Sequence, residues 1–355
     1  MNENPAPPSR PRSMSRRALI ILGGAAGLSV TGSLAGCSLA QQSSFDHQRS
    51  SSSAPPSPTP TPLPGAGDAG LQENDLAGFA AAALHRFGRN LTKGQRNLLT
   101  NLRDAHRDHA EVLARQDPLA ITASTPPSPS AAPTASSVPP APGRTVKRAL
   151  AQLYALETAA ATSYTRRALA PDGPKDQLGG VARLWGSLAT AATCYADLCR
   201  AAKNPGPAVI GDQRANARIP DQATALRDLL EQCYAIIFGY QAAIAELPDG
   251  QAARAIAGLA GYRDLRDQLI DRLGAGKQQL PAASAAYRLP VQPTNLTRAA
   301  TLINLMEVRM LPYLGLWLAT AGRDRTSALH TMITTARDAL SWSPVIIVWP
   351  GYPTS

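Results

Sequence analysis

Residues 226–244 read LRDLLEQCYAIIFGYQAAI, and this stretch decides the fold. Its apolar side chains recur every three or four positions, at Leu226, Leu229, Leu230, Cys233, Ile237, Tyr240 and Ile244. That spacing is typical of an amphipathic α-helix with one buried face. Asp221 precedes the stretch as an expected N-cap, and Pro248 and Gly250 mark its end. We therefore predict a helix over 222–247.

The same periodicity continues on both sides of this helix. It predicts further helices over residues 75–92, 95–116, 145–170, 178–202, 251–274, 296–321 and 324–342. Thr297 is expected to cap the helix at 296–321. Apolar residues make up 44% of the chain and aromatic residues only 5%, with Ala and Leu dominant. Small aliphatic residues favour helices over strands, so we expect an all-α protein.

The eight predicted helices fall into two sets of four that resemble each other. In the third helix of each set, Glu157 is equivalent to Glu307. In the second helix, His106-Arg107-Asp108 is equivalent to Tyr262-Arg263-Asp264. We interpret this as a duplication of one four-helix unit. The alternative is that two stretches rich in Ala and Leu align by composition alone.

The first 37 residues have the features of an export signal. Arg16 and Arg17 precede an apolar run that leads to Leu34-Ala35-Gly36-Cys37. A charged start, a short apolar run and small residues at a cleavage site are typical of a signal peptide rather than a membrane span. The paired arginines resemble a twin-arginine signal, and the last four residues resemble the lipobox of bacterial lipoproteins.

This resemblance implies a lipid anchor. We expect residues 1–36 to be removed and Cys37 to carry a diacylglyceryl group, with a further acyl chain such as palmitate on its amino group. Two or three chains hold a protein firmly to a bilayer where one does not. The expected location is the extracytoplasmic face of a cell membrane.

Proline-rich tracts divide the chain, which contains 31 proline residues in clusters. Residues 37–70 are expected to be a disordered tether behind the anchor, and 118–143 a disordered loop within the first bundle. The linker 204–220 separates a first domain at 71–203 from a second at 221–355. The sequence leaves open whether the two domains pack together.

The charge pattern of the chain does not predict nucleic-acid binding. The formal net charge is +10. Removing the signal peptide takes away four arginines and one glutamate, which leaves about +7. This favours loose contact with an anionic envelope surface, or it serves solubility alone. The chain has no dense basic run interleaved with aromatic residues of the kind that binds nucleic acid.

The second half of the chain resembles a known family. The segments that carry the resemblance are Leu229-Leu230 with Ile237-Phe238-Gly239-Tyr240, the stretch 285–290 (AAYRLP) and Trp349-Pro350-Gly351. They are similar to the uncharacterised ferritin-like domain of bacterial lipoproteins and exported proteins, a domain of unknown function. The resemblance covers 222–353 and implies a four-helix bundle with a long crossover connection. The first half is then a more divergent copy.

Ferritin-like enzymes hold two metal ions with carboxylates and Glu-x-x-His pairs, and this chain contains no such pair. In the second half only Glu307 stands as an expected inward carboxylate, and Tyr262 stands where the family often has histidine. The first half keeps His106 and His109 three residues apart, with Glu157 on the third helix. Two imidazoles and a carboxylate suit a divalent ion such as iron or manganese.

A structural interpretation competes with the metal site. In it the two histidines lie on the surface, because the stretch around them is very polar. Glu157 and Glu307 are buried and pair with arginines of neighbouring helices, for which Arg107 and Arg263 are the candidates. Breaking a fully buried pair of this kind costs about 3–5 kcal/mol.

The remaining cysteines give no clear pattern. Cys194 and Cys199 are five residues apart, on different faces of one helix, so they are not expected to pair with each other. Cys233 is able to meet one of them only if the two halves pack together. Whether a disulfide forms stays open, with small buried residues as the favoured interpretation.

Three functions remain at this point. The first is a non-catalytic lipoprotein that serves as a scaffold or binds an envelope protein or ligand. The second is a ferritin-like protein that binds iron or manganese in a redox or metal-handling role. The third is a carrier of small molecules or lipids in the bundle interior, which no sequence feature supports.

Overall fold

The computed structural model describes residues 63–120, 141–202 and 218–353, all within one compact unit. This part of the chain forms eight α-helices and one short 3-10 helix, and it contains no β-strand. The prediction of an all-α fold is therefore confirmed. No helix in these ranges is long and apolar enough to cross a membrane.

Several predictions concern residues outside the described ranges. These are the signal peptide with Arg16 and Arg17, the lipid attachment at Cys37, and most of the tether, the loop and the linker. The predicted tether ends too late, because a helix already begins at Ala66.

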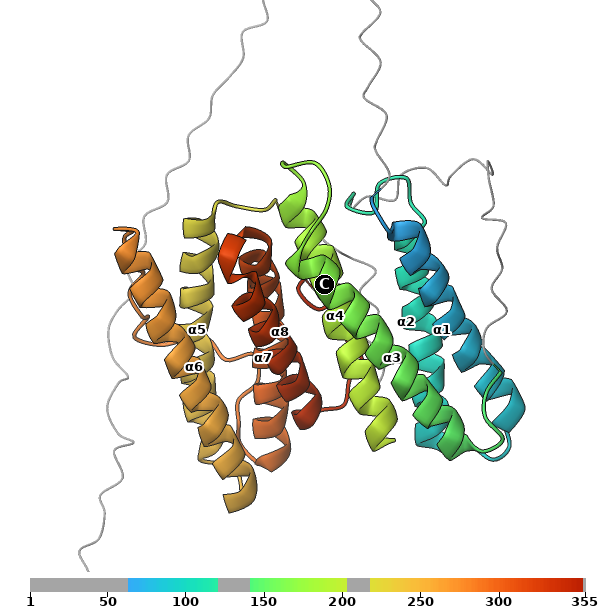
Figure 1. Ribbon diagram of the computed structural model, residues 1–355. Helices are drawn as coiled ribbons and strands as arrows, with labels where there is room; N and C mark the ends of the chain where they lie inside the picture. Colours follow the sequence, from blue (N-terminus) through green and yellow to red (C-terminus); the bar gives the residue numbers. More distant parts are fainter. Residues whose placement is uncertain (1–62, 121–140, 203–217, 354–355) are drawn as a thin grey trace, which may run out of the picture. The chain divides into compact units, whose positions relative to one another are not determined.

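The first four helices pack together (Figure 1). They are α1 (Ala66–Phe87), α2 (Lys93–Leu113), α3 (Val146–Leu169) and α4 (Leu178–Ala201). Helix α1 contacts α2 and α3, and α4 contacts α3 and α2. The predicted start of α1 at residue 75 is too late, because its first turns contain small residues and glycine rather than the large apolar residues that mark a helix face.

The last four helices form a second set. They are α5 (Gln222–Ile244), α6 (Asp249–Ala275), α7 (Leu296–Thr320) and α8 (Arg325–Trp342), with the 3-10 helix η1 (Gly322–Asp324) before α8. Helix α5 contacts α6 and α7, and α7 contacts α8. The described helices therefore agree with two sets of four.

Side-chain caps fix where the helices begin. Thr92 starts α2 with a capping box: its hydroxyl accepts from the N–H of Gln95, whose side chain accepts from the N–H of Thr92. Asp221 caps α5 as predicted. The cap of α7 is Asn295 rather than Thr297, because the helix already begins at the residue after Asn295.

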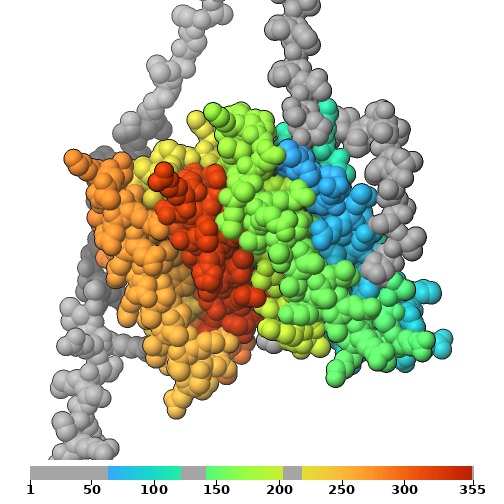
Figure 2. Space-filling view, viewed as in Figure 1, coloured from blue at the N-terminus to red at the C-terminus, as the bar shows by residue number. Residues whose placement is uncertain are grey.

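The two sets share one continuous hydrophobic core. Helix α4 packs against α7 and α8, and Figure 2 shows α8, in red, directly beside the green helices of the first set. A glycine on α4 permits this approach, because a Cβ atom on Gly186 would lie 2.2 Å from Cδ2 of Leu318 on α7. The two halves therefore pack together rather than standing apart.

Candidate metal centre

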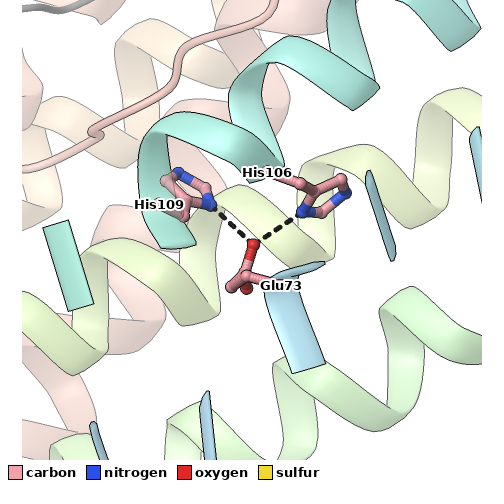
Figure 3. Close-up of side chains that lie close together, drawn as sticks. All are labelled: Glu73, His106 and His109. Atoms are coloured by element: carbon pink, nitrogen blue, oxygen red, sulfur yellow. Dashed lines mark hydrogen bonds and ion pairs between the residues drawn. The ribbon is translucent and has the colours of Figure 1, made fainter. Parts of the chain in front are cut away.

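Three ionisable side chains meet inside the first set of helices. Nδ1 of His106 lies 2.6 Å and Nδ1 of His109 3.0 Å from the same oxygen, Oε2 of Glu73 (Figure 3). Each of the three residues is only 1% exposed. One ligand atom from each lies within 4.8 Å of the others, which is the geometry of a possible metal site.

Local sequence explains why these side chains point inward. Residues three apart share one helix face, and on α2 His106 and His109 continue the buried stripe of Leu98, Leu102 and Ala105. On α1, Glu73 lies within a stripe of buried residues at helical spacing, together with Ala69, Gly70, Leu76, Ala77 and Ala80.

Each imidazole also makes a hydrogen bond on its outer side. Nε2 of His106 lies 2.7 Å from Oε1 of Glu157, and Nε2 of His109 lies 2.8 Å from the carbonyl oxygen of Val348. A carbonyl oxygen only accepts, so Nε2 of His109 carries the proton, and Nδ1 of a neutral imidazole is then an acceptor. It faces the Glu73 oxygen, a second acceptor. Two acceptors repel each other, so this contact requires either a proton between Nδ1 of His109 and Oε2 of Glu73 or a cation bound to both atoms.

Aromatic side chains enclose the cluster. The hydroxyl of Tyr164 on α3 donates to Oε1 of Glu73 at 2.6 Å, which leaves Oε2 for the histidines. The ring of Tyr195 on α4 lies edge-on to His106, with 5.5 Å between ring centroids. The ring of Trp349 lies 4.6 Å from that of His109. These contacts restrict how the imidazoles rotate.

Burial and charge act against each other in this cluster. Burial lowers the pKa of His106, but the carboxyl groups of Glu157 and Glu73 outweigh it and raise that pKa to about 10. Burial raises the pKa of Glu73, yet the two histidines bring it well below its usual range. Burial dominates at Glu157 and raises its pKa, against the effect of His106. A proton on His106 therefore balances the Glu73 carboxylate when no cation is bound.

The second set of helices contains a different buried acid. Glu307 on α7 accepts hydrogen bonds from the hydroxyls of Tyr240 on α5 and Tyr262 on α6. Burial raises its pKa to about 8, although the two hydroxyl donors act in the opposite direction. Glu307, the candidate metal ligand of the second half, therefore lies apart from His106 and His109 and bonds to two tyrosines instead.

The structure also corrects the predicted arginine pairs. Arg107 and Arg263 are both exposed, whereas Glu157 bonds to His106 and Glu307 bonds to tyrosines. The reason is helix phase, since each arginine lies outside the stripe of buried residues on its own helix. The histidines, in turn, are buried rather than on the surface.

The cysteine question is answered for the described residues. Cys194, Cys199 and Cys233 are free and buried. Burial raises the pKa of each thiol, to about 12 for Cys194. This agrees with small buried side chains that have little thiolate character.

Sequence reasoning missed two contributors to the cluster. Glu73 was not considered, yet an acid within an otherwise apolar helical stripe is a signal that identifies it. The carbonyl of Val348 has no such signal, because a backbone oxygen leaves no mark in the side-chain pattern.

Comparison with known proteins finds a family match for the second set of helices. Residues 225–354 match the family described as "Domain of unknown function (DUF4439)". The second half of the chain contains a DUF4439 domain. No curated protein matches the chain. A crystal structure of the conserved hypothetical protein Rv2844 from Mycobacterium tuberculosis is 30% identical, and the match covers 34% of this chain and 93% of that one with a TM-score of 0.32. The first set of helices lies outside the DUF4439 match.

Proposed function

We propose that the first set of helices binds one divalent metal ion, held by Oε2 of Glu73 and the Nδ1 atoms of His106 and His109. One observation carries the proposal: both imidazoles use Nε2 for an outer hydrogen bond and turn Nδ1 toward the same carboxylate oxygen. Metal-binding histidines typically donate their other ring N–H to a carboxylate or a backbone carbonyl, which fixes the tautomer. Glu157 and Val348 provide these two acceptors.

The distances within the cluster fit a metal ion. Metal–nitrogen bonds of about 2.0–2.1 Å separate neighbouring ligand atoms by about 3 Å. The contact of His109 with Glu73 has this length, 3.0 Å, and the contact of His106 at 2.6 Å needs to lengthen only slightly. Oε2 of Glu157 is buried without a hydrogen-bond partner. A nearby cation would compensate such an oxygen.

The ligand types select among metals. Two imidazoles and one carboxylate are typical of non-haem iron(II), and three protein ligands with an open position are also typical of catalytic zinc. We propose iron(II) or manganese(II), with zinc as the alternative. Such an ion supplies redox or Lewis-acid chemistry when bound. The surrounding residues hold it in a dry site and keep both imidazoles in the binding tautomer.

We further propose that this metal site lies outside the cytoplasm. The proposal rests on the sequence: Arg16-Arg17 before an apolar run, a lipobox at Leu34–Cys37 and a proline-rich tether. Lipid on Cys37 then anchors the protein to the membrane surface, and no nucleic acid is involved. An envelope protein or ligand is the expected partner.

For the DUF4439 domain we propose a structural or partner-binding role without metal. Its Glu307 is equivalent in sequence to Glu157, and its Tyr262 to His106, which supports a duplication followed by loss of metal ligands. The two tyrosines occupy both oxygens of Glu307 with hydrogen bonds. A carboxyl group satisfied in this way needs no cation.

Metal analysis tests the proposed function. The full chain, extracted from membranes with its anchor, is expected to carry one equivalent of iron or manganese. His109→Ala and Glu73→Gln should each abolish the metal. His330→Ala is the matched control, because His330 is an exposed histidine of the second set. Metal-free wild type that also fails to bind added Fe²⁺, Mn²⁺ or Zn²⁺ by equilibrium dialysis would overturn the proposal.

The anchor has its own test. Cys37→Ala should move the protein from the membrane fraction to the soluble extracytoplasmic fraction. Mass spectrometry of the mature N-terminal peptide should show a diacylglyceryl cysteine in the wild type. An unmodified Cys37 in membrane-extracted protein contradicts this part of the proposal and leaves the metal site untouched.

A further inference from the structure

The C-terminal segment, residues 346–352 of the DUF4439 domain, follows α8 and packs against α2 and α4 of the first set. Three of its backbone carbonyls accept hydrogen bonds from buried side chains of those helices. The pairs are Tyr195 to Ile347 at 3.2 Å, His109 to Val348 at 2.8 Å and Arg183 to Gly351 at 2.8 Å. The second domain thus reaches into the metal centre of the first.

Side chains of the segment add to these bonds. Trp349 is 3% exposed, packs against the ring of His109 and donates its indole N–H to Asp108, the residue before His109. The guanidinium of Arg183 lies 4.3 Å from the ring centroid of Tyr352. The segment therefore fixes both the ring of His109 and the turn of α2 that carries it.

A pair of glycines makes room for the segment. A Cβ atom on Gly315 of α7 would lie 2.1 Å from the carbonyl oxygen of Gly351. Gly351 itself has a φ of 93°, which residues with a side chain rarely adopt. Docking of the segment thus depends on a contact that lies on α7, outside the cluster.

His109 is held from several sides by these contacts. Nδ1 faces Glu73, Nε2 donates to Val348, and the ring lies between Tyr195 and Trp349. Without the Val348 carbonyl, Nε2 has no acceptor in its present orientation and the imidazole is free to protonate Nδ1 instead. That tautomer cannot bind a metal through Nδ1.

We infer that the C-terminal segment is a positioning element of the cluster, so that docking of the segment and the state of the cluster are coupled. The metal part of this inference rests on the proposed function. Coupling of this kind is reciprocal: if docking strengthens metal binding, metal binding must strengthen docking by the same factor.

Undocking the segment tests the inference from one side. Gly315→Ala should displace the segment, seen as faster amide hydrogen exchange in a peptide spanning 345–353, and should weaken Mn²⁺ or Zn²⁺ binding by about 10- to 100-fold. Gly261→Ala is the matched control, because a Cβ atom there meets nothing within 4 Å. Unchanged affinity with a released segment would overturn the inference and leave the proposed metal site intact. If Gly315→Ala does not fold, Trp349→Phe takes its place, because it removes the indole N–H that bonds to Asp108 and shortens the ring that packs on His109.

The reverse direction is tested without metal. His109→Ala should speed exchange of the same peptide, whereas His109→Gln should restore protection, because the glutamine amide is able to donate where Nε2 did. His109→Gln nevertheless lacks the imidazole ligand and should not bind metal. Equal exchange in wild type and His109→Ala overturns the inference. If the wild type binds no metal, the proposed function fails and this comparison alone decides the inference.

Metal addition completes the design. Zn²⁺ should slow exchange of the 345–353 peptide in the wild type and have no such effect in His106→Ala, which removes a proposed ligand but keeps the bond from His109 to Val348. Binding of Zn²⁺ by dialysis without any change in exchange would count against the coupling.

Discussion

The hydroxyl of Tyr164 on α3 donates a 2.6 Å hydrogen bond to Oε1 of Glu73 on α1, and both groups are buried. This bond leaves only Oε2 of Glu73 for the two histidines. It also satisfies an oxygen that has no access to solvent. Tyr164 therefore determines which oxygen of the carboxylate is available to a metal ion.

Tyr164→Phe is expected to lower the free energy of unfolding by about 1–3 kcal/mol, because a buried carboxylate oxygen loses its donor. Urea denaturation of metal-free protein measures the loss. Tyr154→Phe on the same helix is the control, since Tyr154 is only half-buried, and should change stability by about 0.5 kcal/mol or less. Equal effects of the two variants would show that the bond to Glu73 contributes nothing specific.

Glu73 and Glu157 should behave differently when changed to glutamine. Glu73→Gln removes a proposed ligand and should abolish metal binding. Glu157→Gln keeps an acceptor oxygen for Nε2 of His106 but removes the charge of this outer partner, so metal affinity should fall by about 10- to 100-fold without being lost. Equilibrium dialysis with Mn²⁺ or Zn²⁺ distinguishes the two. Complete loss of binding in Glu157→Gln would make Glu157 a ligand instead.

Glu307 should make the stability of the protein depend on pH. Its pKa is about 8 in the folded protein and near 4.5 in the unfolded chain. The folded state therefore binds more protons between these values, and the free energy of unfolding falls as pH rises from about 4.5 to 8, by at most about 1.4 kcal/mol per pH unit. Asp338, whose own pKa is raised by burial, lies close enough to contribute to the shift of Glu307.

Glu307→Gln tests this, because glutamine stays neutral and is still able to bond to the hydroxyls of Tyr240 and Tyr262. As pH rises from 5 to 8, the wild type should lose unfolding free energy relative to the variant, because only the wild type has a carboxyl group to ionise at this position. Thermal or urea unfolding at several pH values measures it. A difference that stays constant across this range would mean that Glu307 titrates normally.

The sequence predicted much of the fold because helix periodicity is a local property. The pattern around Leu226–Ile244 identified α5, and Asp221 was recognised as its cap. The start of α1 was missed because small residues open it. The cluster was predicted in part. His106, His109 and Glu157 were candidates, whereas Glu73 was missed because the predicted helix began two residues after it, at residue 75.

The sequence could not predict contacts between residues that are far apart along the chain. His109 and Val348 are 239 residues apart, and nothing in either segment marks the other as a partner. The predicted pairs with Arg107 and Arg263 failed for a reason that was available in the sequence. Each arginine lies outside the apolar stripe of its helix, which runs through Leu102 and Ala105 on α2 and through Leu259, Leu265 and Leu269 on α6.

Gly186 should control how the two sets of helices pack. An added Cβ atom would lie 2.2 Å from Leu318 on α7, and overpacking of this kind costs about 1–3 kcal/mol. Gly186→Ala is therefore expected to destabilise the protein, although alanine is the better helix former by about 1 kcal/mol. Gly274→Ala on α6, where a Cβ atom meets nothing within 4 Å, should stabilise it or leave it unchanged.

The shape of the unfolding curve adds a second readout for Gly186→Ala. In the wild type one continuous core joins both sets, so we expect a single cooperative transition. A weakened contact between α4 and α7 should separate it into two, one for each set of helices. Differential scanning calorimetry of the two glycine variants measures this. Two transitions already present in the wild type would mean that the sets fold independently and that the shared core couples them only weakly.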